Sequence, residues 1–389
     1  DIVFERVQFT GTRSLALVYL DYNASTPIAP EVLQEMQPYF QEFYGNPSSD
    51  HWAAHSVKEA IDLARSRVAS LLGCHPDEVI FTSGGSESNN HALKGVYYVL
   101  RECGNHIITT TVEHPSILNP CAFLERMGAE VTYVKVDARG MVSPDDIEQA
   151  INDRTILISV MHANNEVGTI QPIEEISEIA KKHHIVFHTD AAQSVGKIPV
   201  KVNKLGVDLL SIAGHKLYAP KGIGALYVRR KTPIEPYIHG AGQEFGMRAG
   251  TENVPYIVAL GKAAELASQY PDSKEIRELR DYFWERLFSC YGNNIQLNGH
   301  PEKGMPNTLN VSFIGMDGRE ILKQLPEIAA STGSACHSGK TTMSPVLRAM
   351  KISERIGRGA IRFSLGRYTT KQEIDQAMAL LEERIKFSH

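Results

Sequence analysis

The strongest constraint on the fold of this chain is a repeated alternation between short β-branched runs and longer amphipathic patterns. The runs predict strands at residues 79–83, 106–112, 155–161, 185–190 and 208–214. Apolar residues at helical spacing predict helices at residues 56–72, 86–101, 115–127, 143–152 and 172–184. Strands that alternate with helices of this length form βαβ units, in which helices cover both faces of the sheet. The sequence therefore predicts an α/β protein with a mostly parallel sheet.

The pattern changes after about residue 270. A charged helix (SKEIRELRDYFWERLFS) is followed by the runs NTLNVSF and GAIRFSLG and by an amphipathic helix that starts near Thr370. These elements are typical of a smaller α+β domain. With 389 residues, the chain is long enough for two hydrophobic cores. We expect a large domain over residues 18–268 and a small domain made of residues 1–17 and 269–389.

Composition and charge favour an ordinary globular protein. Hydrophobic residues make up 42% and charged residues 22%, and the net charge of -5 favours neither nucleic acid nor an anionic membrane as a partner. No apolar run approaches the roughly 20 residues of a membrane span. Five cysteines at irregular spacing predict reduced thiols, and hence a cytoplasmic location: Cys74, Cys103, Cys121, Cys290 and Cys336. No second cysteine lies near Cys336, so we expect no metal site there.

A Gly-Gly-Ser turn after the first predicted strand is a candidate anion site. In TSGGSESNN, Gly85 and Ser86 stand where the following helix begins. Backbone N–H groups and the helix dipole favour an anion at such a position, and the Ser86 hydroxyl adds a donor. Taken alone, the same residues favour a plain helix cap, because Gly-Gly-Ser after a strand is common, so the turn by itself does not establish a phosphate site.

Three chemically capable side chains follow other predicted strands. His114 stands in VEHPS, Asp190 in HTDAAQ and Lys216 in AGHKLYAPKG. Singly, Asp190 could be a structural cap and Lys216 a solvated surface charge. Ligands of open α/β sheets bind at the carboxyl ends of the strands, so we expect these side chains to meet in one crevice.

The combination matches the needs of pyridoxal 5′-phosphate (PLP). This cofactor requires an anion-binding turn, a carboxylate at its ring nitrogen and a lysine that forms a Schiff base. The Gly-Gly-Ser turn together with His215 suits the phosphate, and Asp190 suits the ring nitrogen. His114 suits a flat contact with the ring, and Lys216 suits the aldehyde carbon.

Ten motifs follow one another in a recognisable order across residues 18–385. They are LDYNASTP, GNPSS, FTSGGSESNN, VEHPSI, HANNEVGTIQ, HTDAAQSVGK, GHKLYAPKGIGALYVRR, MRAGTEN, SACHSG and IRFSLGRYTT. In this order the chain resembles the cysteine desulfurases of the NifS/IscS type, which are class V PLP enzymes of fold type I.

The resemblance implies a seven-stranded sheet in the large domain and a homodimer with its sites near the subunit interface. It implies that Asn165 and Gln193 lie near the ring oxygen of PLP and that Thr251 contacts the phosphate of the other subunit. Asn165 and Arg362 would bind the substrate, with the planar guanidinium of Arg362 on its carboxylate. Lys216 would be the Schiff-base lysine.

The resemblance also implies a role for Cys336 in STGSACHSG. Its thiolate would take the sulfur of L-cysteine as a persulfide and leave L-alanine, and His114 and Lys216 would assist the chemistry. The persulfide would pass to an acceptor protein, such as an iron–sulfur scaffold or a sulfurtransferase.

The sequence is also compatible with other functions. ACHS, TSGGSESNN and GTEN also resemble selenocysteine lyases, whose substrate would be L-selenocysteine. An aminotransferase or β-lyase of the same fold would need no thiol at Cys336, and a non-catalytic sulfur carrier would need no lysine at Lys216. Ala213 stands where most relatives have a hydroxyl on the phosphate, so the phosphate lacks one expected donor.

Overall fold

A seven-stranded sheet forms the centre of the larger part of the molecule. The computed structural model describes residues 17–269, 273–333 and 343–387. The strand order is β2 (Val79–Thr82), β8 (Gly224–Val228), β7 (Leu209–Ala213), β6 (Val186–Asp190), β5 (Thr155–Ser159), β3 (His106–Thr110) and β4 (Glu130–Val134). Both pairings of β8 are antiparallel and all others are parallel. The predicted α/β class with a mostly parallel sheet is confirmed.

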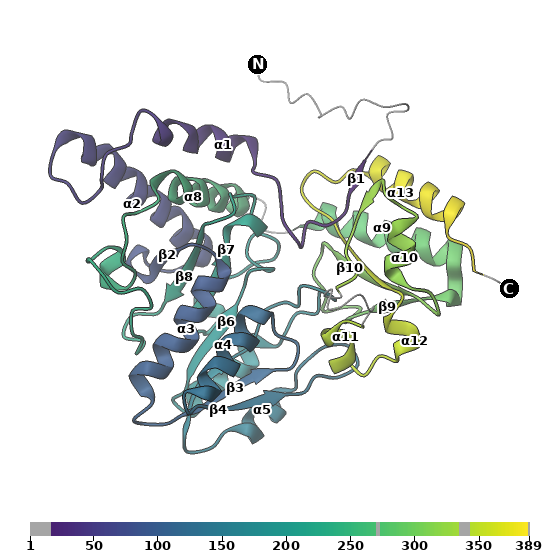
Figure 1. Cartoon of the computed structure of the whole chain (residues 1–389), viewed down its shortest axis with the longest axis horizontal. Helices are drawn as coiled ribbons and strands as arrows, with labels where there is room; N and C mark the ends of the chain where they lie inside the picture. The colour runs from purple at the N-terminus through teal and green to yellow at the C-terminus, as the bar shows by residue number, and fades with distance from the viewer. Residues whose placement is uncertain (1–16, 270–272, 334–342, 388–389) are drawn as a thin grey trace.

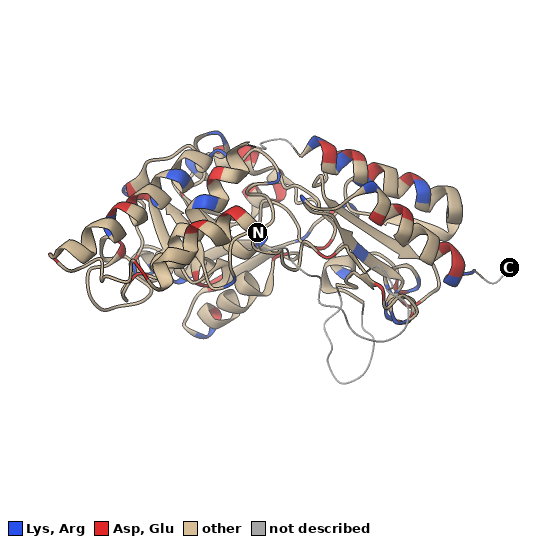
Figure 2. Cartoon of the chain, turned by 90° about the horizontal axis from the view of Figure 1, so that it is seen from above, with Lys and Arg blue, Asp and Glu red and all other residues tan. Residues whose placement is uncertain are grey.

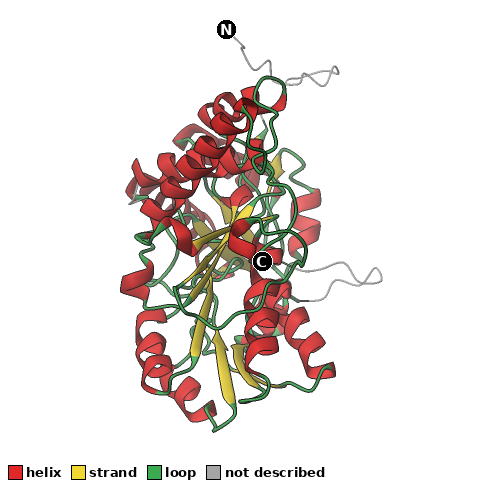
Figure 3. Cartoon of the chain, turned by 90° about the vertical axis from the view of Figure 1, so that its left-hand side faces the viewer, coloured by secondary structure: helices red, strands yellow, loops and turns green. Residues whose placement is uncertain are grey.

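Helices cover both faces of this sheet, as Figures 1 and 3 show. They are α1 (Pro30–Met36), α2 (Trp52–Leu72), α3 (Gly85–Leu100), α4 (Pro115–Arg126), α5 (Pro144–Ala150), α6 (Ile173–Lys182), α7 (Val202–Leu205) and α8 (Val254–Gln269). Successive strand residues enter different cores: Ile107 packs with α3 and α4, whereas Ile108 packs with α2, α6 and α8. Both faces are therefore buried, as βαβ units require.

The C-terminal part has its own antiparallel sheet and its own core. Its strands are β12 (Ala360–Ser364), β10 (Thr308–Phe313) and β9 (Ile295–Asn298). Its helices are α9 (Lys274–Tyr291), α10 (Gly318–Lys323), α11 (Pro345–Ala349), α12 (Glu354–Gly357) and α13 (Lys371–Arg384). Figure 2 shows that positively and negatively charged residues alternate along the outer helices of this part.

The first described strand joins the two parts. β1 (Val18–Tyr19) pairs in parallel with β11 (Ile328–Ala329), and Val18 and Leu20 pack in the core of the C-terminal part. The chain then crosses to α1 in the larger part (Figure 1). The division into residues 18–268 and the remainder stays a prediction. Within the described ranges, no helix is both long and apolar enough to cross a bilayer.

Candidate active site

A cavity of ≈ 330 Å³ lies at the carboxyl ends of the parallel strands. The strand-end residues Asp190 and Ala213 reach it from β6 and β7, and Arg362 reaches it from β12 of the C-terminal part. Among the predicted site residues, nine line this cavity: Gly85, Ser86, His114, Asn165, Asp190, Gln193, His215, Lys216 and Arg362. The expected crevice therefore collects residues from both parts of the molecule.

The Gly-Gly-Ser turn begins a helix of sixteen residues, α3, with its first residue at the cavity. Gly84 precedes the helix at φ 147°, a conformation that favours glycine, and no side chain caps the helix. A Cβ built at Gly85 would lie 3.2 Å from the Cβ of Ala213. Uncapped N–H groups and the small neighbours leave a place for an anion at the wall of the cavity.

His215 lies on the same wall and is neutral without a ligand. Its Nδ1 lies 3.3 Å from Ser25 Oγ, and burial, assisted by the cationic Lys216, lowers its pKa to about 4. An anion placed against this imidazole would raise the pKa again, because it favours the charged form.

A chain of hydrogen bonds links Asp190 to His114. Asn89 donates from Nδ2 to Asp190 Oδ2 at 2.8 Å and to Ser116 Oγ at 2.8 Å. The other carboxylate oxygen of Asp190 accepts from the N–H of Ala192 at 3.0 Å. Since a carboxylate only accepts, these contacts fix both the Asp190 carboxylate and the amide of Asn89. The Oδ1 of Asn89 is buried without a partner among the described residues.

The imidazole of His114 is held by its own helix terminus. His114 is the N-cap of α4, and its Nδ1 accepts from the N–H of Ser116 at 3.1 Å. The ring is partly open to solvent, yet neighbouring atoms displace enough water to lower its pKa, against the opposing effect of Asp190. A neutral ring that accepts at Nδ1 carries its proton on Nε2.

Lys216 follows β7 in a short 3₁₀ turn and reaches the crossing segment after β1. Its Nζ donates to the carbonyl oxygens of Asn23 and, at 2.7 Å, of Ala24. Burial and then the cationic Arg362 lower its pKa to about 8, while the carboxylates of Asp21 and Asp190 act in the opposite direction. A lysine with this pKa has a substantial free-amine fraction near neutral pH, as a nucleophilic lysine requires.

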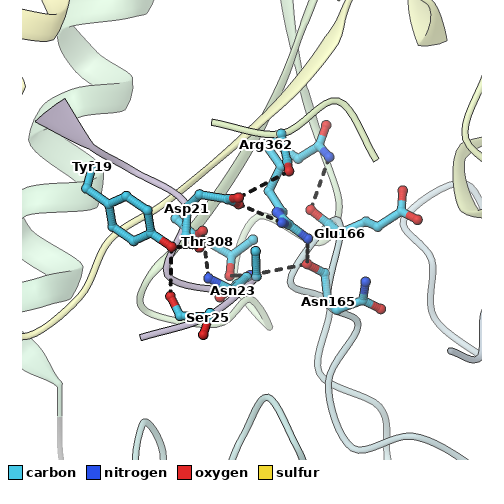
Figure 4. Close-up of polar contacts among 12 residues, drawn as sticks. Tyr19, Asp21, Asn23, Ser25, Asn165, Glu166, Thr308 and Arg362 are labelled. Carbon is cyan, nitrogen blue, oxygen red and sulfur yellow. Dashed lines mark hydrogen bonds and ion pairs between the residues drawn. The ribbon is translucent and has the colours of Figure 1, made fainter. Parts of the chain in front are cut away.

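Arg362 is buried, with 6% of its surface exposed, between two oxygen acceptors (Figure 4). Its Nη2 pairs with Asp21 Oδ1 at 2.7 Å, and its Nη1 donates to the carbonyl of Asn165 at 3.0 Å. Its Nε is buried without a partner among the described residues. An unpaired N–H of a buried guanidinium is a strong donor for a carboxylate.

Two predicted residues are not placed in the cavity. Thr251 is exposed and is absent from the cavity lining of its own chain. Cys336 lies outside the described residues. Lys216, Asp190 and His114, by contrast, are brought together as predicted.

Several residues of the site carry no strong signal in the sequence that predicts a role for them. Asn89 stands four residues after Gly85 on α3, and this spacing could have placed it on the same helix face. Asn23 and Lys197 stand in the motifs LDYNASTP and HTDAAQSVGK. No local pattern distinguishes them, because their contacts join segments far apart in the chain.

Known proteins similar to this chain agree on one family. The model of the aminotransferase class-V family matches residues 18–377. The cysteine desulfurase IscS of Dictyoglomus turgidum is 50% identical over 373 residues, which is 95% of this chain and 94% of the relative. The cysteine desulfurase IscS of Methanosarcina thermophila is 48% identical, over 95% of this chain and 92% of its own.

Solved structures give the same result. A NifS-like protein superposes with a TM-score of 0.88 at 39% identity and covers 94% of this chain and 98% of its own. A structure described as SspA in complex with cysteine has a TM-score of 0.81 at 41% identity, covering 91% and 100%. These relatives favour the desulfurase over the selenocysteine lyase. Enzymes of this family depend on PLP, and this chain belongs to it, among the cysteine desulfurases of the NifS/IscS type.

Proposed function

We propose that this chain converts L-cysteine to L-alanine and transfers the sulfur to Cys336. The observation that supports this function best is the convergence of Lys216, Asp190 and Arg362 on one cavity. A nucleophilic amine, an anchored carboxylate and a buried guanidinium are the groups that an amino-acid substrate and PLP need. The SspA relative, which was solved with cysteine, supports this substrate.

The residues present fit PLP. The N–H groups at the start of α3 and the imidazole of His215 would hold its phosphate, and Asp190 would accept from its ring nitrogen. His114 would lie against the ring, with Asn165 and Gln193 near the ring oxygen. PLP, when bound, supplies an electrophilic aldehyde and a ring that stabilises negative charge at the substrate Cα.

Arg362 and Lys216 would act on the substrate. The Nε of Arg362 has no partner among the described residues, so it would donate to the substrate carboxylate without first breaking a contact. Lys216, with its pKa of about 8, would take the proton from Cα and return a proton to the alanine product.

The Cys336 thiolate would then attack the sulfur atom of the substrate. The Cβ–S bond breaks, the new S–S bond forms, and Cβ receives a proton, which gives alanine and the Cys336 persulfide. L-cysteine and the enzyme thiol therefore become L-alanine and an enzyme persulfide, with no external oxidant. We propose that an iron–sulfur scaffold or a sulfurtransferase accepts this sulfur.

We also propose a homodimer in the cytoplasm. Thr251 is exposed and absent from its own cavity, which suits a residue that completes the site of a second subunit. Cys74, Cys103, Cys121 and Cys290 are free thiols, which is typical of a reducing compartment.

The test compares the wild type with Cys336→Ser and Lys216→Ala by measuring alanine released from L-cysteine. We expect Cys336→Ser to bind PLP with wild-type affinity but to form no alanine, because the serine oxygen cannot take the sulfur. Lys216→Ala should lose the PLP adduct that borohydride reduction fixes to the protein. Wild-type alanine release by Cys336→Ser, or an adduct on another lysine such as Lys221, would contradict the proposal.

A further inference from the structure

Lys197 is a buried lysine that the proposed chemistry does not use. It lies on the segment after β6, four residues beyond Gln193, and only 8% of its surface is exposed. Its Nζ donates to Gln193 Oε1 at 2.9 Å and to Asn23 Oδ1 at 3.5 Å. The structure gives it no carboxylate partner within the described ranges. It does not line the cavity, so its hydrogen bonds reach the site only through these two amides.

The contacts of Gln193 fix the orientation of its amide from two sides. Its Nε2 donates at 3.0 Å to the carbonyl oxygen of Asn23, which also accepts from Lys216. A carbonyl can only accept, so this contact selects the nitrogen end of the amide. Lys197 selects the oxygen end on the opposite side. One hydrogen of Nε2 is used by Asn23, and the other remains for a ligand in the cavity that Gln193 lines.

We propose that Lys197 is a positioning residue that holds the Gln193 amide with its N–H, rather than its carbonyl oxygen, toward the ring oxygen of bound PLP. This inference rests on the proposed role of Gln193. Without Lys197, only the Asn23 carbonyl still selects the nitrogen end of the amide, so the amide turns more readily and presents Oε1 to an oxygen that carries negative charge. Two acceptors facing each other repel, so the affinity for PLP falls.

The electrostatic surroundings of Lys197 argue against a merely structural role. Burial, and then the cations Lys216 and Arg362, lower its pKa to about 7. Burying an amine beside two cations, with no carboxylate partner among the described residues, works against stability. A methionine of similar length would fill the same space without that cost. A residue that opposes stability where an apolar one would fit is better explained by its effect on the ligand.

Lys197→Met tests this proposal against the matched control Lys201→Met. Lys201 is an exposed lysine that donates to the carbonyls of Ser70 and Leu71, away from the cavity. We expect Lys197→Met to raise the Kd of PLP for the apoenzyme about tenfold, the equivalent of one hydrogen bond to a charged group. Its unfolding midpoint without PLP should equal or exceed that of the wild type. Lys201→Met should keep the wild-type Kd.

The absorbance of bound PLP provides a spectroscopic readout. Below its pKa of about 7, Lys197 adds a positive charge near the protonated link between PLP and Lys216, and Lys197→Met removes that charge. We therefore expect the midpoint of its pH-dependent absorbance change to rise in Lys197→Met and to stay constant in Lys201→Met.

A double-mutant cycle with Gln193→Leu shows whether Lys197 acts through this amide. If it does, Gln193→Leu weakens PLP binding by itself, and adding Lys197→Met to it changes the Kd no further. If Lys197→Met raises the Kd of PLP tenfold both in the wild type and in Gln193→Leu, the proposal is overturned, while the role of Gln193 stays intact. A wild-type Kd for Gln193→Leu would overturn the assigned role of Gln193 and, with it, the inference. Neither result bears on sulfur transfer to Cys336, which the alanine assay measures separately.

Discussion

Lys216 shows how the surroundings of one side chain prepare it for covalent chemistry. Its amine lies near the cationic Arg362, whose own carboxylate partner, Asp21, pairs at 2.7 Å. Burial is the larger cause of the lowered pKa of Lys216, and the field of Arg362, which the Asp21 pair compensates only in part, adds to it. The free amine is thus available well below the pH at which an ordinary lysine, with a pKa of roughly 10.4, would lose its proton.

This pKa predicts the pH dependence of PLP loading. The reaction of the apoenzyme with PLP needs the neutral amine, so its rate should rise with pH and level off above about 8. Arg362→Leu removes a cation and leaves Asp21 unpaired, and both changes should move the midpoint upward. The measurement is the rate of PLP incorporation in stopped-flow absorbance, divided by the rate of a free model amine in the same buffers. A wild-type midpoint near 10 would contradict the lowered pKa.

The sequence identified the reactive residues better than the residues that hold them. Lys216 and His114 each follow a predicted strand and Asp190 is the last residue of one, so the rule that ligands bind at strand ends was sufficient to group them. Asn89 and Lys197 act through hydrogen bonds to residues from other segments. Such contacts depend on the relative positions of segments, which composition and spacing do not specify.

At the scale of elements, the start of α3 depends on how closely β8 approaches it. A Cβ at Gly224, the first residue of β8, would lie 2.5 Å from the carbonyl oxygen of Ile212 and 2.7 Å from the Cα of Gly84. β8 is therefore packed against the turn that precedes the expected phosphate site. No side chain larger than hydrogen fits there without moving that turn.

Gly224→Ala should destabilise the protein and weaken PLP binding together. Forcing a methyl group into this contact is expected to cost about 1–3 kcal/mol of unfolding free energy. Gly242→Ala is the matched control, since a Cβ there meets nothing within 4 Å, and it should change stability by less than about 0.5 kcal/mol. Thermal unfolding of the apoenzymes and PLP titration measure both effects. Equal behaviour of the two variants would show that the approach of β8 is unimportant.

The two strands of the seven-stranded sheet that the sequence did not predict, β4 and β8, have identifiable physical features. β4 is an edge strand whose first four residues are exposed or half-buried, so it lacks the continuous apolar run of a central strand. β8 begins at Gly224, directly after a Pro-Gly-containing segment typical of a turn. The five predicted strands, in contrast, are buried almost throughout and carry continuous apolar or β-branched runs, and this holds even for β2 at the other edge of the sheet.

At the scale of the whole molecule, two features favour assembly into a dimer. Several large hydrophobic side chains between residues 28 and 52 face solvent, among them Tyr44 and Trp52, which are 80% and 85% exposed. Exposed aromatic side chains at this density are typical of interaction surfaces. Thr251 provides the second feature, because it is exposed and does not line the cavity of its own chain.

Mixed dimers test whether Thr251 acts on the other subunit. A dimer of one Lys216→Ala chain and one Thr251→Ala chain contains a single site that combines an intact Lys216 with an intact Thr251 from its neighbour. We expect each parent variant alone to bind PLP weakly or to be inactive, and the purified mixed dimer to recover about half of the wild-type alanine formation per dimer. Activity recovers because the Thr251→Ala chain supplies Lys216 and the Lys216→Ala chain supplies Thr251 to the same site. If Thr251 serves its own subunit, both sites of the mixed dimer are defective, and no recovery occurs. Differential tags on the two chains isolate the mixed species, and the same chains kept apart serve as the control.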